Sequence, residues 1–222
     1  MRAILSLLIL MSVSSCMLTI PTNYSGSDVG YAVMGIGQST ALALNKYNLP
    51  IDSYRFVFRR IGEKHKGWLY YPTYNNLFSN RKTKRYRSSD ETGIVEIAAL
   101  QAGQYELVNF EVFRSHASPF DMLLPDVSGS AQDFSIPFEI KPGKVVYLGN
   151  YQANLLSKKG DVFFIVEDRF ARDLALAKLH IELLPVENAR DAMPDVEKVG
   201  NRFLISAAQA KAREAANPGV QP

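Results

Sequence analysis

The sequence predicts a mainly β protein: an antiparallel β-sandwich of about seven strands with one or two helices at its C-terminal end. Short segments in which apolar and polar residues alternate recur between Tyr54 and Val166, and turn-forming residues separate them. A segment whose apolar residues have helical spacing follows only after them. Strands at short intervals are typical of sandwiches, whereas parallel α/β sheets alternate strands with helices, so these observations favour the sandwich.

Seven segments have the pattern of strands. The first two form a hairpin whose turn spans residues 63–67, and residues 101–104 join two later strands. Apolar residues occupy every second position from Phe134 to Ile140, which predicts a strand with one buried face. Pro137 lacks an N–H and places that strand at a sheet edge or a bulge, while the continuously apolar residues 162–166 predict a central strand. The expected strands span residues 54–60, 68–71, 93–100, 105–113, 134–140, 145–156 and 162–166.

Two helices are expected after the strands. Asp168 is a suitable N-cap for the first, and Pro185 ends it. Between them, apolar residues recur at helical spacing on one face: Phe170, Leu174, Ala177 and Ile181. A second, alanine-rich helix is expected over residues 205–216. Residues 30–44 are small and apolar, with the pattern of neither a helix nor a strand, and they lack the third glycine of a dinucleotide-binding loop.

The N-terminus has the features of an export signal. Arg2 supplies a positive charge, and residues 3–13 form an apolar run that is too short to cross a bilayer as a relaxed helix. The run ends in Val13-Ser14-Ser15-Cys16, which resembles the lipobox of bacterial lipoproteins, whose cysteine receives a lipid. We therefore expect a lipoprotein signal peptide over residues 1–15 and lipid attachment at Cys16.

The use of cysteine agrees with this interpretation, because Cys16 is the only cysteine in the chain. The body can form no internal disulfide and must be held together by packing. The alternative is an uncleaved anchor extended through Leu18 and Ile20, which the serines and Pro21 disfavour. Lipoproteins with aspartate after the cysteine are typically retained at the inner membrane. Met17 stands there instead, so the resemblance implies the outer membrane, facing the periplasm.

Three parts are expected after the signal peptide. Residues 16–50 would be the lipidated N-terminus, a polar tether over residues 22–28 and a first segment of undefined structure. Residues 51–185 would form the β-sandwich domain with a helix at its end, and residues 186–222 a partly helical C-terminal extension. The mature chain of 222 − 15 = 207 residues is long enough for one sizeable domain. The formal charge of the full sequence is +3 and drops by one when Arg2 is removed, so it demands no acidic partner.

Two turn regions carry a family resemblance. Leu100, Gly103, Tyr105 and Leu107 match the "aliphatic, two residues, Gly, x, Tyr, x, Leu" pattern of transthyretin-like and carboxypeptidase-regulatory-like sandwiches. Residues 138–149 are similar to the "strand, Pro-Gly turn, Tyr-Leu-Gly strand" of bacterial outer-membrane lipoproteins of unknown function with such a domain. The resemblance covers roughly residues 54–185. It implies an architecture and transfers no catalytic residues, since these modules generally have none.

Motifs for nucleophilic or metal-dependent catalysis are absent from the sequence, which has no Gly-x-Ser-x-Gly, Walker loop or His-Glu-x-x-His. We expect no catalytic residue, no metal and no cofactor. The histidines are isolated in sequence, which favours solvated or capping roles over ligation: His65, His116 and His180. Three loop aspartates do not have EF-hand spacing, which favours a plain surface loop over a calcium site: Asp121, Asp126 and Asp133.

A strongly basic segment is the main candidate for binding. It holds five cations within seven residues and follows an aromatic stretch: Arg81, Lys82, Lys84, Arg85 and Arg87. Export argues against nucleic acid as its partner, so an anionic surface or an acidic envelope protein remains as the functional interpretation. A solvated loop between strands, over residues 72–92, is the simpler alternative.

Two hypotheses about function follow. The first is a non-catalytic structural or protein-interaction module, anchored to the membrane through lipid on Cys16 and holding an envelope protein. The alternative is an envelope hydrolase or a protein that binds an anionic lipid or glycan surface. The hydrolase would need His65 or His116 to converge with Asp121 or Glu63 in the fold.

Overall fold

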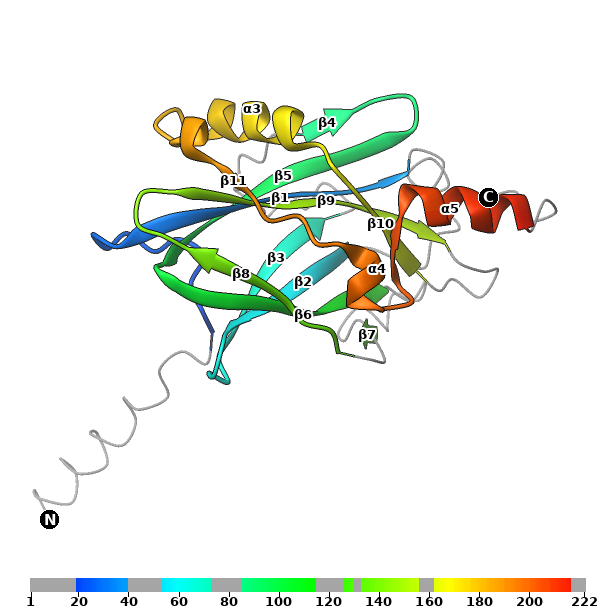
Figure 1. The fold of residues 1–222 in the computed structure, drawn as a ribbon, viewed down its shortest axis with the longest axis horizontal. Helices are drawn as coiled ribbons and strands as arrows, with labels where there is room; N and C mark the ends of the chain where they lie inside the picture. The colour runs from blue at the N-terminus through cyan, green and yellow to red at the C-terminus, as the bar shows by residue number, and fades with distance from the viewer. Residues whose placement is uncertain are drawn as a thin grey trace, which may run out of the picture.

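The computed structural model describes residues 19–39, 53–72, 85–114, 126–129, 133–155 and 162–216. Within them the fold is mainly β and consists of two sheets (Figure 1). The mixed sheet has the order β12 (Leu204–Ser206), β10 (Val162–Glu167), β9 (Val145–Leu155), β1 (Val29–Ser39), β5 (Glu91–Gln101), β4 (Arg85–Arg87), with β11 (Arg190–Asp191) also pairing with β9. The antiparallel sheet has the order β3 (Lys66–Pro72), β2 (Ser53–Arg60), β6 (Gly103–Arg114), β7 (Asp126–Gly129), with β8 (Ile136–Ile140) also pairing with β6.

The main core lies between the two sheets and is rich in aromatic rings. Phe56 of β2 lies 4.7 Å from Tyr151 of β9 and 4.9 Å from Phe164 of β10, between ring centroids. Alternation along β2 points Tyr54, Phe56 and Phe58 into this core. Because the body has no disulfide, this aromatic packing is a principal source of its stability.

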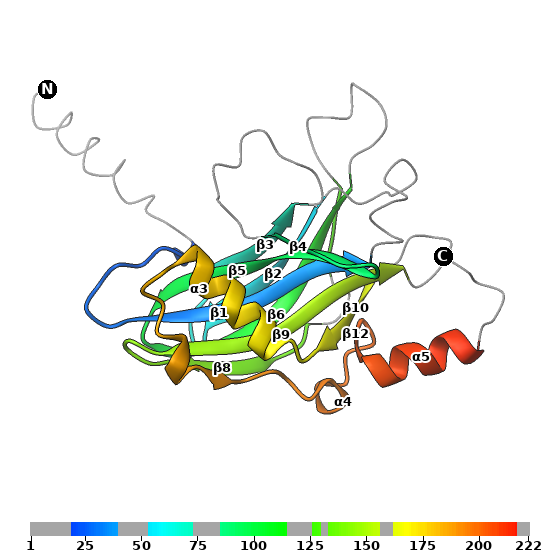
Figure 2. The same cartoon turned by 90° about the horizontal axis from the view of Figure 1, so that it is seen from above.

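A helical layer covers the opposite face of the mixed sheet. Helix α3 (Phe170–His180) lies across this sheet (Figure 2), and its Leu174 and Ala177 pack against Val33, Val95 and Tyr147. The predicted apolar face of this helix is therefore confirmed, but its expected ends are wrong: the N-cap is Arg169 rather than Asp168, and the helix ends at His180, before Pro185. Asp168 lies one residue earlier, where its Oδ1 accepts from the N–H of Phe170 at 2.9 Å. The other helical segments among the described residues are the 3₁₀ turn η2 (Val186–Asn188), α4 (Val196–Val199) and α5 (Ala207–Ala216).

The described residues hold more than the expected seven strands, because β1, β4, β7, β11 and β12 were not predicted; β1 is the longest of these. It lies between β5 and β9 in the mixed sheet, and it is buried by the core on one face and by α3 on the other. A strand buried on both faces has no polar face and hence no alternation. Its small residues also weaken the pattern of a strand, and close packing requires them. A Cβ at Gly30 would lie closer than 3.0 Å to the Lys141 carbonyl oxygen.

The expectation of wholly antiparallel sheets is wrong. Strands β1 and β9 run parallel, with Tyr31 opposite Val145, and β12 and β11 add further parallel pairs to β10 and β9. The last two strands come from residues 186–222, which were expected to be an extension outside the domain. Periodicity identifies a strand but carries no information about its partner or direction, so the sequence pattern could not reveal this topology.

The seven predicted strands are all present, whereas β4 and β7 lie in segments that were expected to be loops. Strands β2 and β3 form the expected antiparallel hairpin, although its turn lies at residues 61–65 and Gly67 belongs to β3. Strand β8 pairs with β6 alone among the described strands, as Pro137 implied. Strand β10 lies between β9 and β12, as expected for a central strand. The second helix begins at Ala207, because Leu204–Ser206 forms β12.

The segment before β1 differs from the expected free tether. Thr19 forms a parallel bridge with Lys66 of β3, and the N–H of Ile20 donates to the Lys66 carbonyl at 2.8 Å. Asn23 bridges to Ala99 of β5 in the other sheet, and the N–H of Tyr24 donates to the Ala99 carbonyl at 3.0 Å. Residues 19–24 therefore join the edges of both sheets.

The turn between β5 and β6 is held by a tyrosine. Tyr105 is 2 % exposed, and its hydroxyl donates to the carbonyl of Gln101 at 2.8 Å. Its ring stacks on Phe138 at 5.6 Å between centroids. This arrangement explains why an aromatic residue with a hydroxyl follows the glycine of the turn.

Candidate functional site

The predicted site residues fall partly outside the described residues. Four of them lie outside the described residues: Cys16, Arg81, Lys82 and Lys84. The lipid attachment and this part of the basic segment therefore stay predictions. Arg85 and Arg87 lie on β4 with exposed side chains. Strand β4 is at the edge of the mixed sheet and pairs only with β5 within the part of the chain that the structure describes.

Tyr86, between these two arginines, points inward and reaches a buried polar network. Its hydroxyl accepts from Gln152 Nε2 at 2.6 Å and from Asn150 Nδ2 at 3.0 Å. Asn150 and Gln152 lie on β9 and are 0 % and 5 % exposed. Burial raises the pKa of Tyr86 well above its usual value, which outweighs the hydrogen bonds from Asn150 and Gln152. Tyr86 therefore stays protonated and fixes β4 to the sheet.

Asp173 of α3 is the acidic centre of the same network. Its Oδ2 accepts from the Tyr147 hydroxyl at 2.9 Å and from Asn150 Nδ2 at 3.1 Å, and its Oδ1 from Arg172 Nε at 2.8 Å. Arg172 also pairs with Glu91 of β5. Burial raises the pKa of Asp173, although the charge of Arg172 and the three hydrogen bonds oppose this shift. We call these groups the Tyr86–Asp173 network: Tyr86, Glu91, Tyr147, Asn150, Gln152, Arg172 and Asp173.

Glycines make the space in which this network lies. A Cβ at Gly35 would lie closer than 3.0 Å to Asn150 Nδ2 and Asp173 Oδ2. A Cβ at Gly37 or Gly93 would approach the Tyr86 hydroxyl equally closely. The glycines of residues 30–44, which suggested an incomplete dinucleotide loop, therefore serve side-chain packing on a central strand.

The geometry of the network favours a structural role. Asp173 is 0 % exposed, and the oxygens of its carboxylate are occupied by side chains of the protein itself. The network connects α3, β4, β5 and β9, so it fixes the helix on the sheet and the edge strand beside it. The sequence pattern did not reveal the network, because its members are spread over residues 86–173. The one local indication is the alternation along β4, which turns Tyr86 inward between Arg85 and Arg87.

A small cavity lies at the turn between β8 and β9. Its volume is about 180 Å³, and Lys141, Lys144 and Arg190 contribute cations to its lining. Glu139 is also in the lining and pairs with Lys141 at 3.2 Å and with Arg190 at 3.7 Å. Because this carboxylate partly neutralises the cations, the cavity has a mixed rather than a strongly anion-binding character.

The other predicted chemical groups are dispersed. His65 and His180 are exposed, as Glu63 is, and His116 and Asp121 lie outside the described residues. Asp133 is exposed and accepts from Asn109 Nδ2 at 2.8 Å. Across residues 19–216, leaving out the undescribed gaps, no group of three or more His, Cys, Asp or Glu side chains could hold a metal ion.

Among the helices that the structure describes, none is both long enough and apolar enough to span a bilayer. No protein-family model matches the sequence, and no curated protein matches it either. One solved structure, a leucine-rich repeat protein from Bacteroides thetaiotaomicron VPI-5482, is similar over 55 % of this chain, with 18 % identity and a TM-score of 0.29. The matched part covers 12 % of that protein.

Proposed function

We propose that the chain is a lipid-anchored lipoprotein of the bacterial cell envelope, and that its folded body is a non-catalytic structural or protein-interaction module. The export signal and Val13-Ser14-Ser15-Cys16 support the anchor. The observation that carries the proposal is the position of Thr19, which pairs with Lys66 only 19 − 16 = 3 residues after Cys16. Lipid on Cys16 would hold the folded body directly at a membrane. With Met17 after the cysteine, the outer membrane is the proposed location.

The proposed architecture is a variant of the transthyretin-like β-sandwich, extended by α3 and by parallel strands. The turn that carries the sequence resemblance supports it, because Tyr105 donates from its hydroxyl to the Gln101 carbonyl at 2.8 Å. A tyrosine that bonds back to the backbone at a strand corner is a recurring device of such sandwiches. Gly143, with φ +62°, forms the Pro-Gly turn of the second stretch.

The proposed contact surface is the edge formed by β4. Arg85 and Arg87 present two cations on a strand whose outer side pairs with no described residue. Extended segments bind to such edges through backbone hydrogen bonds, and charges on the edge then select the partner. The network below Tyr86 holds the strand in place, which lowers the entropic cost of binding. An acidic envelope protein fits this surface.

Of the groups that the envelope-hydrolase alternative needs, His116 and Asp121 lie outside the described residues, and the other two lie on a turn that is open to solvent. Glu63 and His65 lie on the exposed turn between β2 and β3, and Asp173 is enclosed by the protein. We therefore retain the interaction module as the proposed function.

The test uses the tagged full-length protein with a photo-crosslinking amino acid in place of Arg85, and a matched protein with the same replacement at exposed Lys211 of α5. We expect the N-terminal peptide to carry acyl chains on Cys16, and a dominant protein crosslink from position 85 but not from position 211. The crosslink should disappear in Cys16→Ser and weaken in Arg87→Glu. An N-terminal peptide without lipid would reject the anchor, and equal crosslinks from both positions would reject the β4 edge as the contact surface.

A further inference from the structure

Resting on the proposed lipid anchor, we propose that the turn between β2 and β3, together with Lys66, lies against anionic phospholipid headgroups and orients the body on the membrane. We call residues 61–66 the headgroup surface. The proposal concerns a different part of the molecule from the basic segment at residues 81–87. The sequence pattern predicted the turn but not its position at a membrane, which depends on where Thr19 is attached.

The reach of the anchor sets the geometry. Thr19 bridges to Lys66, and the N–H of Ile20 donates to the Lys66 carbonyl. Only two residues lie between Cys16 and Thr19, so three Cα–Cα steps join them. A chain of three residues spans at most about 11 Å. The lipid-bearing residue must therefore stay close to the start of β3, and the adjoining turn must stay close to the membrane.

The chemistry of the turn suits a headgroup region. Ile61 is 49 % exposed, and residues 62–66 are exposed as well. Arg60, Lys64 and Lys66 carry three positive charges against one negative charge on Glu63, which leaves 3 − 1 = +2. Glu63 pairs with Arg60 at 3.6 Å, so Lys64 and Lys66 supply the net charge. An apolar side chain beside lysines is the combination that binds anionic membrane surfaces.

The turn is held firmly enough to define an orientation. The N–H of Ile61 donates to the Gln104 carbonyl at 2.9 Å, and Arg60 Nη2 donates to the Ala102 carbonyl at 2.5 Å. The N–H of Ala102 in turn donates to the Asp28 carbonyl at 3.0 Å. The turn, the β5–β6 connection and the N-terminal segment therefore form one hydrogen-bonded unit.

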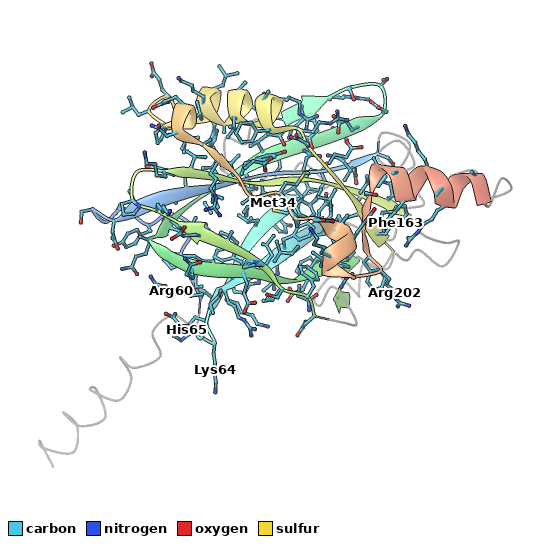
Figure 3. All side chains as sticks on the ribbon, viewed as in Figure 1. Met34, Arg60, Lys64, His65, Phe163 and Arg202 are labelled. Atoms are coloured by element: carbon cyan, nitrogen blue, oxygen red, sulfur yellow. The ribbon has the colours of Figure 1, made fainter. Side chains whose placement is uncertain are left out.

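Figure 3 shows Lys64 and His65 projecting outward from this turn, well apart from Arg202 and Phe163 beside α5. The body would therefore approach the bilayer with the β2–β3 turn first and hold α5 away from it. Lys211 of α5, which is exposed, provides a matched position on the distant part.

The experiment places an environment-sensitive fluorophore on Lys64→Cys in the full-length lipidated protein, with Lys211→Cys as the matched control. Because Cys16 is the only native cysteine and lipid consumes its thiol, each variant has one reactive thiol. The proteins are reconstituted in vesicles of phosphatidylethanolamine and phosphatidylglycerol with brominated acyl chains. The labelled Lys64→Cys protein keeps one unneutralised cation, Lys66, so we expect weakened but clear quenching and a blue-shifted emission at position 64, and neither at position 211.

A second variant tests the charges. Lys66→Glu in the Lys64→Cys protein leaves neither of the two unneutralised lysines and changes the charge by two units. We expect the equilibrium between the membrane-bound and the released turn to shift by about 30-fold toward release. Loss of quenching in this variant, with an unchanged circular dichroism spectrum, supports the headgroup surface.

The outcomes separate this inference from the proposed function. If the protein is acylated and membrane-bound but positions 64 and 211 are quenched equally, the headgroup surface is rejected while the anchor stands. If Cys16 accepts a second fluorophore and the protein stays in solution, the anchor is rejected, and the inference is rejected with it.

Discussion

The guanidinium of Arg172 lies over the ring of Tyr86, with its central carbon 3.9 Å from the ring centroid. Arg172 belongs to α3 and Tyr86 to the edge strand β4, so this contact joins the helical layer to the edge of the mixed sheet. The same arginine pairs with Asp173 and Glu91. Its removal should therefore affect both the stability of the fold and the position of the strand that we propose as a contact surface.

The first prediction concerns this arginine. Arg172→Met leaves the buried carboxylate of Asp173 without its cation, and we expect the free energy of unfolding to fall by about 3 kcal/mol. The double variant Arg172→Met/Asp173→Asn should recover more than half of that loss, because a neutral amide no longer needs the cation. Urea denaturation followed by circular dichroism measures both values. Arg190→Met, at an exposed pair 3.7 Å long, is the control and should change stability by less than about 0.5 kcal/mol.

The second prediction tests the close packing at Gly35. A methyl group there would meet Asn150 and Asp173 at less than 3.0 Å, so Gly35→Ala should destabilise the protein by about 2 kcal/mol. Gly62 is the control, because its φ is +84° and nothing lies within 4 Å of an added Cβ. A substitution there therefore causes backbone strain without crowding. Gly62→Ala should cost only about 1 kcal/mol. A smaller loss at Gly35 than at Gly62 would contradict the packing described for β1.

The third prediction concerns pH. Burial raises the pKa of Glu106, but hydrogen bonds from Ser135 and Arg59 and the charge of Arg59 outweigh it, so this pKa lies below its usual 4.5. A carboxyl whose pKa is lowered on folding stabilises the protein above its unfolded-state pKa, and this contribution disappears as the pH falls through the folded-state pKa. Glu106→Gln should therefore be less stable than the wild type by about 1 kcal/mol at pH 7.

At pH values below the folded-state pKa of Glu106, the wild type and Glu106→Gln should differ little in their free energy of unfolding. Chemical denaturation of both at neutral pH and at several values below pH 4.5 gives the comparison. A stability difference that stays constant through that acid range would show that the carboxylate charge is not what Ser135 and Arg59 stabilise.

The fourth prediction addresses the N-terminal segment. The amide protons of Ile20 and Tyr24 are in hydrogen bonds to Lys66 and Ala99, whereas those of a solvated spacer would exchange freely. We expect hydrogen–deuterium exchange at these two positions to be slowed by at least about 100-fold relative to an unstructured peptide. Exchange at the unstructured rate would remove the basis for placing Cys16 close to the body.

The strands with one buried face could be predicted from the sequence, because the alternation of apolar and polar residues is visible within a few consecutive positions. The alternation of Tyr54, Phe56 and Phe58 and the apolar stripe around Leu174 both identify the face that packs. Strand β1 was not predictable in this way, because α3 covers its second face and removes the polar residues that alternation needs. The parallel pairing of Tyr31 with Val145 joins residues far apart in the chain, and no local rule can encode it.

The candidate site was predicted only in part, for a similar reason. The cations at Arg85 and Arg87 were visible as a cluster, but no local pattern indicates that the partners of Tyr86 are Gln152 and Asn150. A polar network becomes visible only when the fold brings β4, β9 and α3 together. By contrast, processing enzymes read export signals from the extended chain, so the prediction of lipid attachment needs only a short local pattern.

The position of β1 in the middle of the mixed sheet also constrains the order in which the chain can fold. Its parallel partner begins 145 − 31 = 114 residues later, and β12 completes the sheet only at Leu204–Ser206. Folding that depends on such distant contacts is slow, and a nascent chain that ends before β9 would expose an unpaired, apolar strand. On the proposed export, crossing the membrane as an unfolded chain would let this protein avoid a partly formed sheet and fold after β12 has been delivered.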